Sequence, residues 1–277
     1  MAAKKTPKKA TAKPALKKLA KKVAAKTATE KRPAGKSAAK KRSQLAKKAS
    51  LSPALVATVY AKLRERHSDA HCELDHESPY QLILATVLSA QSTDVMVNKI
   101  TPQLFERWPT PQALAHAEPA QVEQVLSKIG MYRQKTKNVI GLSKRLIEEH
   151  GGEVPRTLDE LVKLPGVGRK TANVVLGVAF GAPEGVVVDT HVQRISQRLG
   201  WTKHTEPQDI EQDLMALFPR SDWDMLSHTL IFHGRRICAA RKPACSACPV
   251  SAECPSAFDA EHVGRKKPGL RSRTAKP

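Results

Sequence analysis

Four cysteines crowd into one short stretch near the end of the sequence. They are Cys238, Cys245, Cys248 and Cys254, with the spacing C-x6-C-x2-C-x5-C. Cysteines this close together are typical of a metal centre in a reducing, intracellular protein, and not of the disulfide framework of a secreted one. Tetrahedral zinc and an iron–sulfur cluster both accept four thiolates, and the spacing by itself favours zinc, the commoner structural metal.

A second candidate site surrounds a Gly-x-Gly turn, Gly166-Val167-Gly168, which is followed at once by Arg169 and Lys170. Glycines let the main chain turn sharply and approach a ligand, and a helix that begins just after them presents unpaired N–H groups. This combination indicates a phosphate-binding turn that reads no base sequence. Helix–helix connections also use glycine for purely steric reasons, so the turn alone does not settle the matter.

Lys170 and Asp189 are the residues in this region that could do chemistry. The positive end of a helix dipole, the neighbouring Arg169 and partial burial all disfavour the ammonium form of Lys170, and a neutral amine is a nucleophile. Its alternative role is a plain phosphate contact. Asp189 precedes an apolar helical pattern and is expected to cap it, while its carboxylate could also stabilise positive charge or relay protons. Because one helix and its connection separate the two residues, both can face one cleft.

The elements that would position these residues are helices. From about Leu51 onward, apolar residues recur at helical spacing, and Thr110-Pro111, Thr157 and Glu206-Pro207 each mark a helix start. The spacing predicts a helix over 158–164, a turn, and a second helix over the apolar face of Ala172, Val175, Leu176 and Ala179. The run 186–188 is too short to anchor a sheet. We therefore expect an all-α body of packed antiparallel helices.

The charge of the chain is concentrated at its beginning. The net charge is +21, and residues 1–48 hold 18 Lys or Arg against one acid for +17, which leaves +4 for the rest of the chain. Such a Lys/Ala-rich segment is predicted to be disordered and to tether the protein to DNA by neutralising phosphates. A solubility tail and a basic targeting segment are the alternatives. The sequence has no apolar run of ~18 residues and no signal peptide, so we expect a soluble cytoplasmic protein without membrane contact.

The string LPGVGRKTANVV at 164–175, followed by VDTH at 188–191, closely resembles the signature of the endonuclease III family of helix-hairpin-helix DNA glycosylases. The blocks LSAQSTD at 88–94 and IFHGR at 231–235 match as well, and the resemblance extends over most of 51–257. It implies that Lys170 and Asp189 are catalytic, that Lys170 attacks the sugar C1′ to form a Schiff base, and that β-elimination then cuts the strand 3′ to the lesion.

The resemblance also implies how DNA is held. Gln91 would fill the stack that an extruded base leaves, and Met131 stands where leucine is common in the family. His191 could hydrogen-bond near the lesion or only occupy the helix start. The hairpin residues Gly166, Val167, Gly168 and Arg169 would bind the backbone.

For the four cysteines the resemblance favours a [4Fe-4S] cluster over zinc, because all three intervals match. The cluster would shape a basic loop whose Arg241 and Lys242 meet the phosphates. Cys72 is left over, and we expect it to be a small buried apolar residue.

The implied architecture is a two-lobed helix-hairpin-helix fold. One lobe would be a bundle over 72–183, the other would combine 49–71 with 184–258 around the cluster, and 259–277 would be a flexible basic C-terminus. The implied function is base excision repair by a bifunctional DNA glycosylase and abasic-site lyase that removes oxidised pyrimidines from duplex DNA. We expect a monomer associated with the nucleoid.

Two alternatives have other consequences. The related adenine glycosylase lacks lysine at the position of Lys170, and it usually carries a further C-terminal domain, whereas only a short stretch follows Cys254 here. A nucleoid protein that only binds DNA would have no need for Lys170 and Asp189 together.

Overall fold

The computed structural model describes residues 52–263, and within that range the chain is helical with no strands. The predicted N-terminal tail over 1–48 lies outside these residues. The described part of the chain begins with the helices α3 (Pro53–Arg66), α4 (Pro79–Ser89), α5 (Asp94–Arg107), α6 (Pro111–Ala115), α7 (Pro119–Leu126), α8 (Tyr132–His150) and α9 (Leu158–Leu161). They are followed by α10 (Arg169–Phe180), α11 (Thr190–Leu199), α12 (Pro207–Leu217) and α13 (Trp223–Arg236), and by three 3-10 turns, η1 (Arg220–Asp222), η2 (Cys245–Ala247) and η3 (Ala260–His262).

Capping residues and prolines explain where many of these helices begin. The predicted start at Thr110-Pro111 is confirmed, because the Thr110 hydroxyl accepts a hydrogen bond from the backbone N–H of Ala113. Ser52, Ser78 and Thr93 cap α3, α4 and α5 in the same way. Proline occupies the first position of α3, α4, α6, α7 and α12, where a helix needs no N–H donor.

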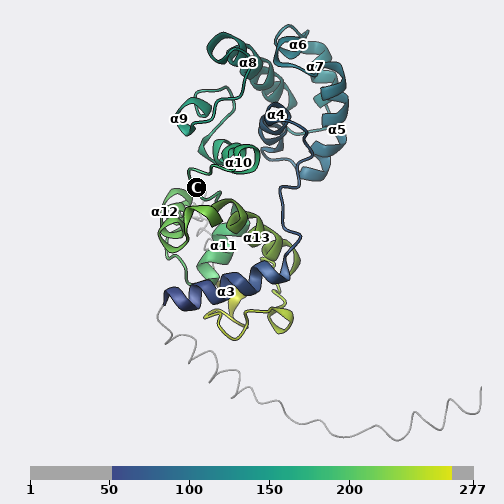
Figure 1. The fold of residues 1–277 in the computed structure, drawn as a ribbon. Helices are drawn as coiled ribbons and strands as arrows, with labels where there is room; N and C mark the ends of the chain where they lie inside the picture. Colours follow the sequence, from purple (N-terminus) through teal and green to yellow (C-terminus); the bar gives the residue numbers. More distant parts are fainter. Residues whose placement is uncertain (1–51, 264–277) are drawn as a thin grey trace, which may run out of the picture. The chain divides into compact units, whose positions relative to one another are not determined.

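The helices bury two separate apolar cores (Figure 1). The larger core takes its residues from 74–176, and Leu82, Leu84, Val139, Leu142 and Leu176 are among its fully buried members. The other core joins α3 to α11, α12 and α13, through residues such as Leu63, Ile195, Leu214 and Leu230. The all-α, two-lobed prediction is therefore confirmed. The exact domain boundaries stay a prediction.

One helix is shorter than predicted. The spacing predicted a helix over 158–164, but α9 ends at Leu161, and Lys163 and Leu164 close two turns through hydrogen bonds to the carbonyls three residues earlier. The cause is Pro165, which disfavours a helical conformation for the residue before it and has no N–H of its own. The run 186–188 forms no strand and leads directly into α11, as expected.

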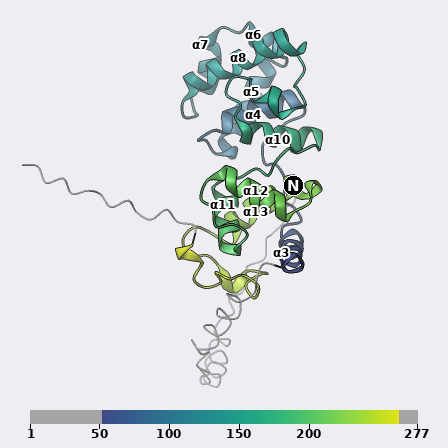
Figure 2. The same ribbon diagram turned by 90° about the vertical axis from the view of Figure 1, so that its left-hand side faces the viewer.

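Helices α3, α11, α12 and α13 surround the second core. The cysteine-rich segment after α13 packs against these helices, on the side that faces away from α10 (Figure 2). Its end is more ordered than predicted, because η3 forms over 260–262 with Ala260 buried. Residues 264–277 lie outside the described part of the chain. None of the helices between residues 52 and 263 is both long enough and apolar enough to cross a bilayer.

Candidate active site

Lys170 and Asp189 line the same cavity, whose volume is about 130 Å³. Lys170 is the second residue of α10 and is exposed, so the partial burial expected for it is wrong, whereas Asp189 directly precedes α11 and is half-buried. The two helix starts therefore bring an amine and a carboxylate to one opening, as their separation by one helix predicted. The side chain of Val174, one turn after Lys170, forms part of the wall.

Asp189 caps α11, as the sequence predicted. Its Oδ1 atom accepts hydrogen bonds from the backbone N–H groups of His191 and Val192, each at 2.8 Å. Two such bonds fix the carboxylate against the helix start and leave little rotational freedom. The cap therefore holds a negative charge at the cavity, where a positive charge could develop.

The hairpin between α9 and α10 uses its two glycines differently. Gly166 has φ +78°, and an ideal Cβ there would lie 2.7 Å from Nδ2 of Asn138, so this position requires glycine. Gly168, at the N-cap of α10, has an ordinary φ and nothing within 4 Å of an added Cβ, so its surroundings are open to an approaching group. Val167 is buried in the core, so its backbone alone could meet a ligand.

Arg169 has a partner that the sequence did not indicate. Its guanidinium donates from Nε to Glu211 Oε2 at 2.9 Å and from Nη2 to Oε1 at 3.1 Å. Asn173, on the same side of α10, donates to the same carboxylate at 3.1 Å. Glu211 belongs to α12 and is 5% exposed, so its carboxylate fastens the first turns of α10 to that helix. The DNA contact of Arg169 stays a prediction.

His191 is held inside the second lobe. Its Nδ1 atom lies 3.1 Å from Nη2 of Arg194, which donates to it, and burial is the main reason that its pKa is lowered. The ring is therefore a neutral acceptor at physiological pH. Both roles that the sequence allowed for His191 remain open.

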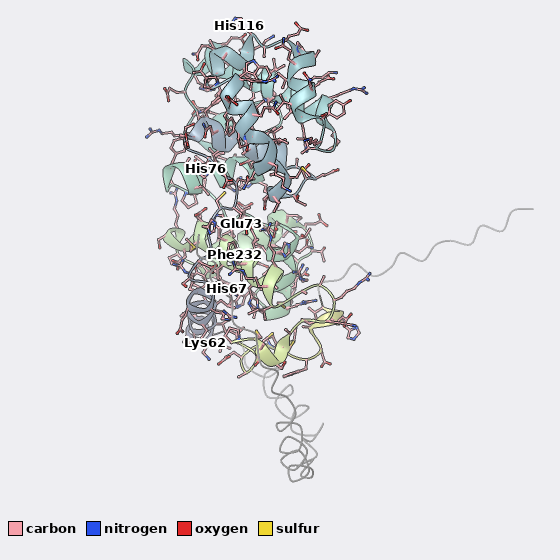
Figure 3. The ribbon with its side chains drawn as sticks, turned by 90° about the vertical axis from the view of Figure 1, so that its right-hand side faces the viewer. Lys62, His67, Glu73, His76, His116 and Phe232 are labelled. Atoms are coloured by element: carbon pink, nitrogen blue, oxygen red, sulfur yellow. The ribbon has the colours of Figure 1, made fainter. Side chains whose placement is uncertain are left out.

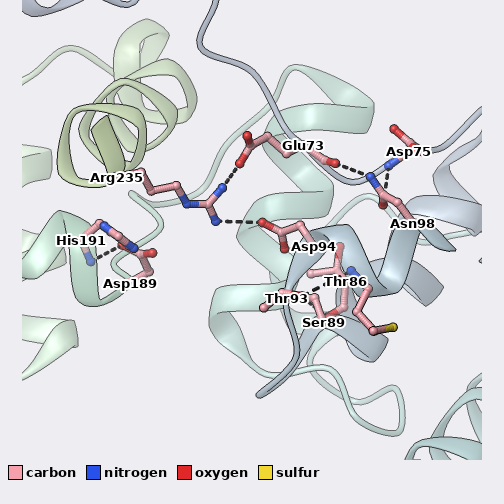
Figure 4. A network of polar contacts seen from close by, with 11 residues as sticks. Glu73, Asp75, Thr86, Ser89, Thr93, Asp94, Asn98, Asp189, His191 and Arg235 are labelled. Carbon is pink, nitrogen blue, oxygen red and sulfur yellow. Dashed lines mark hydrogen bonds and ion pairs between the residues drawn. The ribbon is translucent and has the colours of Figure 1, made fainter. Parts of the chain in front are cut away.

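The cavity contains a charged network that sequence reasoning missed (Figure 4). Arg235 of α13 forms ion pairs with Glu73 and with Asp94 at the start of α5, the second with Nη2 and Oδ2 2.8 Å apart. Burial is the first cause of a raised pKa for Asp94, and the nearby Asp189 adds to it. Asp94 and Arg235 each lie in a sequence block that resembles the family, and these blocks were the signal from which the two residues could have been found. Glu73 lies on the segment between α3 and α4, outside any motif (Figure 3).

Two acidic or basic side chains of the cavity carried no sequence signal. Asp224 and His228, one turn apart on α13, line it together with Cys72. Cys72 is half-buried and packs against the larger core, as predicted for an apolar residue, but it also faces the cavity.

Gln91 and Met131 lie at the tips of two loops. Gln91 follows α4, Met131 precedes α8, and both side chains are exposed. Both have a left-handed backbone, with φ of 55° and 56°, which is uncommon for residues other than glycine. Neither lines the cavity of Lys170.

The four cysteines surround one apolar pocket against the second core. Burial raises the pKa of Cys248 to about 11 and that of Cys254 to about 12, and the neighbouring thiols contribute to both shifts. Over residues 52–263, no three His, Cys, Asp or Glu side chains gather closely enough to hold one metal ion. All four cysteines nevertheless border the same pocket.

Two buried residues, Arg198 and His233, lie beside sulfur atoms of this pocket. Arg198 is 1% exposed and donates to Sγ of Cys238 at 3.2 Å and to the carbonyl of Ala239 at 2.8 Å. His233 lies 3.7 Å from Sγ of Cys248, and burial lowers its pKa to about 3, so its ring is neutral. The positive charge of Arg198 would stabilise a thiolate at Cys238. In the loop between the first two cysteines, Arg241 and Lys242 are both exposed.

Comparisons with known proteins agree on one family. Residues 84–220 match the HhH-GPD superfamily of base excision DNA repair proteins. The chain is 52% identical to an endonuclease III of Synechocystis over 195 residues, which cover 70% of this chain and 89% of that one.

Solved structures give the same result. The chain is similar to endonuclease III in a non-covalent complex with DNA and in a trapped covalent intermediate with DNA. Each has a TM-score of 0.70 and 44% identity, and covers 74% of this chain and 96% of the other.

Replacing Glu211 with Gln should lower the free energy of unfolding by about 2 kcal/mol, because Arg169 and Asn173 both lose part of a buried acceptor. We place the value below the range for fully buried pairs, since the Arg169 side chain is 39% exposed. Urea unfolding measured by circular dichroism checks this prediction.

Glu149→Gln is the matched control, because Glu149 pairs with Arg145 on the surface of α8. It should change the stability by less than about 0.5 kcal/mol. If both substitutions change the free energy of unfolding equally, Glu211 does not stabilise the packing of α10 on α12.

Proposed function

The chain belongs to the endonuclease III family, and from that premise we propose that Lys170 is its nucleophile, that Asp189 assists, and that it removes oxidised pyrimidines from duplex DNA. It is a bifunctional DNA glycosylase and abasic-site lyase of base excision repair. The observation that carries the assignment of residues is the shared cavity, which Lys170 and Asp189 reach from two helix starts.

In the first step, the neutral amine of Lys170 attacks C1′ of the damaged nucleotide. The N-glycosidic bond breaks, and the base leaves with the bonding electrons and takes up a proton. Positive charge develops at C1′ and the ring oxygen as the base departs. The carboxylate of Asp189, fixed by its two backbone hydrogen bonds, stabilises that charge electrostatically.

In the second step, the Lys170 adduct opens the sugar ring and forms a Schiff base between Nζ and C1′. Loss of a proton from C2′ then expels the 3′ phosphate, so the C3′–O bond breaks and the strand is cut. Hydrolysis of the imine returns Lys170. The exposure of Lys170 suits these reaction steps, because its side chain must stay attached to a sugar whose ring opens.

The damaged base must leave the stack before it reaches the cavity, at a cost of about a few kcal/mol. We propose that Gln91 and Met131, at their exposed loop tips, fill the space that it leaves. The open backbone at Gly168 would meet a phosphate with the N–H groups of the first turn of α10, which no side chain caps. The exposed Arg241 and Lys242 would meet the backbone elsewhere.

We propose that Cys238, Cys245, Cys248 and Cys254 hold a [4Fe-4S] cluster. The apolar pocket that all four cysteines line and the buried Arg198 beside Cys238 support this proposal, and the spacing of the cysteines, which matches the family in all three intervals, favours the cluster over zinc. When bound, the cluster supplies a rigid tether for the loop that carries Arg241 and Lys242. The chemistry of base removal remains with Lys170.

For the cell, we propose duplex DNA with damaged bases or abasic sites as the partner, with the protein acting as a monomer near the cytoplasmic nucleoid. The basic tail over 1–48 would add affinity that does not depend on DNA sequence. Lys170 favours this function over that of the related adenine glycosylase.

Borohydride should trap the protein covalently on a duplex that contains thymine glycol, and the strand should be cut without borohydride. Lys170→Ala should lose trapping by about 100-fold or more, because no other amine takes its place. Gel shift of the labelled strand measures both. If neither protein traps, this lesion is not a substrate for Schiff-base chemistry.

Asp189→Asn is the companion variant. An asparagine can still accept the two N–H bonds of the cap, so the melting temperature should change little while trapping slows. Wild-type rates in this variant would exclude a role for the charge of Asp189.

The purified protein should be yellow-brown with an absorbance band near ~400 nm, and it should contain iron. Cys248→Ser should lose the band and weaken DNA binding, because the basic loop loses its tether. A colourless protein with one equivalent of zinc would contradict the cluster.

Deleting residues 1–48 should weaken DNA affinity and reduce the slope of its salt dependence, since those residues carry 18 basic side chains. The single-turnover rate on saturated substrate should not change. Fluorescence anisotropy at several salt concentrations tests this, and equal slopes for both proteins would exclude the tether.

A further inference from the structure

Lys135 is a buried lysine that the mechanism above does not use. It lies on α8, one turn after Met131, and it is 3% exposed. Its Nζ atom donates to Oγ of Ser92 at 2.8 Å, and within residues 52–263 this hydroxyl is its one hydrogen-bond partner. Burial lowers the pKa of Lys135, because its charged form loses water. A buried amine lowers the stability of the fold, so the hydrogen bond from Lys135 to Ser92 needs a functional explanation.

That contact joins two loops. The Lys135 backbone N–H donates to the carbonyl of Met131 at 3.0 Å, while its side chain holds Ser92, the residue after Gln91. The loops themselves also meet, because an ideal Cβ on Gly130 would lie 4.0 Å from the carbonyl oxygen of Gln91. The backbone bond is the ordinary one of a helix start, so it is the side chain of Lys135 that ties the loop of Gln91 to the helix that Met131 begins.

Both tips have a backbone that needs support. The left-handed φ values of Gln91 and Met131 are unfavourable for residues other than glycine, and such conformations persist only where surrounding contacts impose them. Met131 also exposes 51% of an apolar side chain to water. Neither feature stabilises the protein in the absence of DNA, so both are features of a surface prepared for a ligand.

We propose that Lys135 is a positioning residue that holds Gln91 and Met131 side by side as one preformed wedge for the DNA stack. This inference rests on the proposed function, in which these two side chains fill the space of the extruded base. Prior ordering of the wedge removes an entropic cost from extrusion. Lys135 contacts neither the damaged nucleotide nor Lys170, and it acts through the two loops.

The test separates extrusion from chemistry by using Lys135→Met, which keeps an unbranched side chain one atom shorter and removes its donor. Extrusion is followed by the fluorescence of 2-aminopurine opposite a tetrahydrofuran abasic analogue, and chemistry by borohydride trapping. We expect single-turnover cleavage of a duplex abasic site to slow about tenfold, as for loss of one hydrogen bond to a charged group. The fluorescence rise should shrink in parallel, while trapping on a single-stranded abasic oligonucleotide stays at the wild-type rate.

Two further variants keep the test decisive if Lys135→Met folds poorly. Ser92→Ala removes the acceptor and should give the same duplex defect, and the double variant should be no worse than either single one, because both remove one interaction. Lys135→Arg retains a donor and should recover part of the fluorescence signal.

Tyr80→Phe is the matched control. Its hydroxyl bonds to Oγ of Ser143 at 2.9 Å and so joins α4 to α8, the same helix that carries Lys135, away from the tips. It should lower the melting temperature and leave extrusion unchanged. An equal slowing on single-stranded and duplex substrates, additive effects of Lys135→Met and Ser92→Ala, or a fluorescence loss in Tyr80→Phe would overturn the proposal. If wild-type protein fails to trap on any abasic substrate, the proposed function fails, and the fluorescence arm still tests Lys135.

Discussion

The buried carboxylate of Glu211 is the constraint on which the active site depends. It receives hydrogen bonds from Arg169 and Asn173, on either side of Lys170 along α10. It also presses against Gly185, in the connection that leads from α10 to Asp189, where any Cβ would collide with it. One side chain of α12 thus fixes the helix of the nucleophile and the approach to the capping aspartate.

The same constraint explains why the hairpin relies on its backbone. With Arg169 tied to Glu211, the positive character near Lys170 comes mainly from the N–H groups of the first turn of α10. Those N–H groups belong to the helix backbone, so their direction is fixed, unlike that of a flexible side chain. A phosphate bound there would be held in register with the amine, whatever the base sequence.

Residues close in sequence, or within repeating patterns, were predictable. The capping role of Asp189 follows from the apolar spacing after it, and the start of α10 follows from the glycine turn before Lys170. The early end of α9 was not predicted, because the apolar pattern continues to Leu164 and only Pro165 indicates that the helix stops sooner. The family blocks supplied candidate roles that composition and spacing could not.

Long-range pairs were not predictable, because no local pattern specifies them. Glu211 lies 42 residues from Arg169, and Asp94 lies 141 residues from Arg235. Each acid looks like an ordinary residue at a helix surface until the helices pack. Lys135 is a similar case, since a lysine next to Gln134 and Lys137 gives no sign that its side chain points inward.

The order of the two cores along the chain affects how the protein is made. The larger core is complete once residues up to Leu176 have been synthesised, whereas α3 must wait for partners that extend to Val250. On the ribosome, the bundle can fold while the apolar face of α3 remains uncovered. Helix α3 and the cysteine segment then pack together, so the stretch proposed to hold the cluster is also the one that completes the second core.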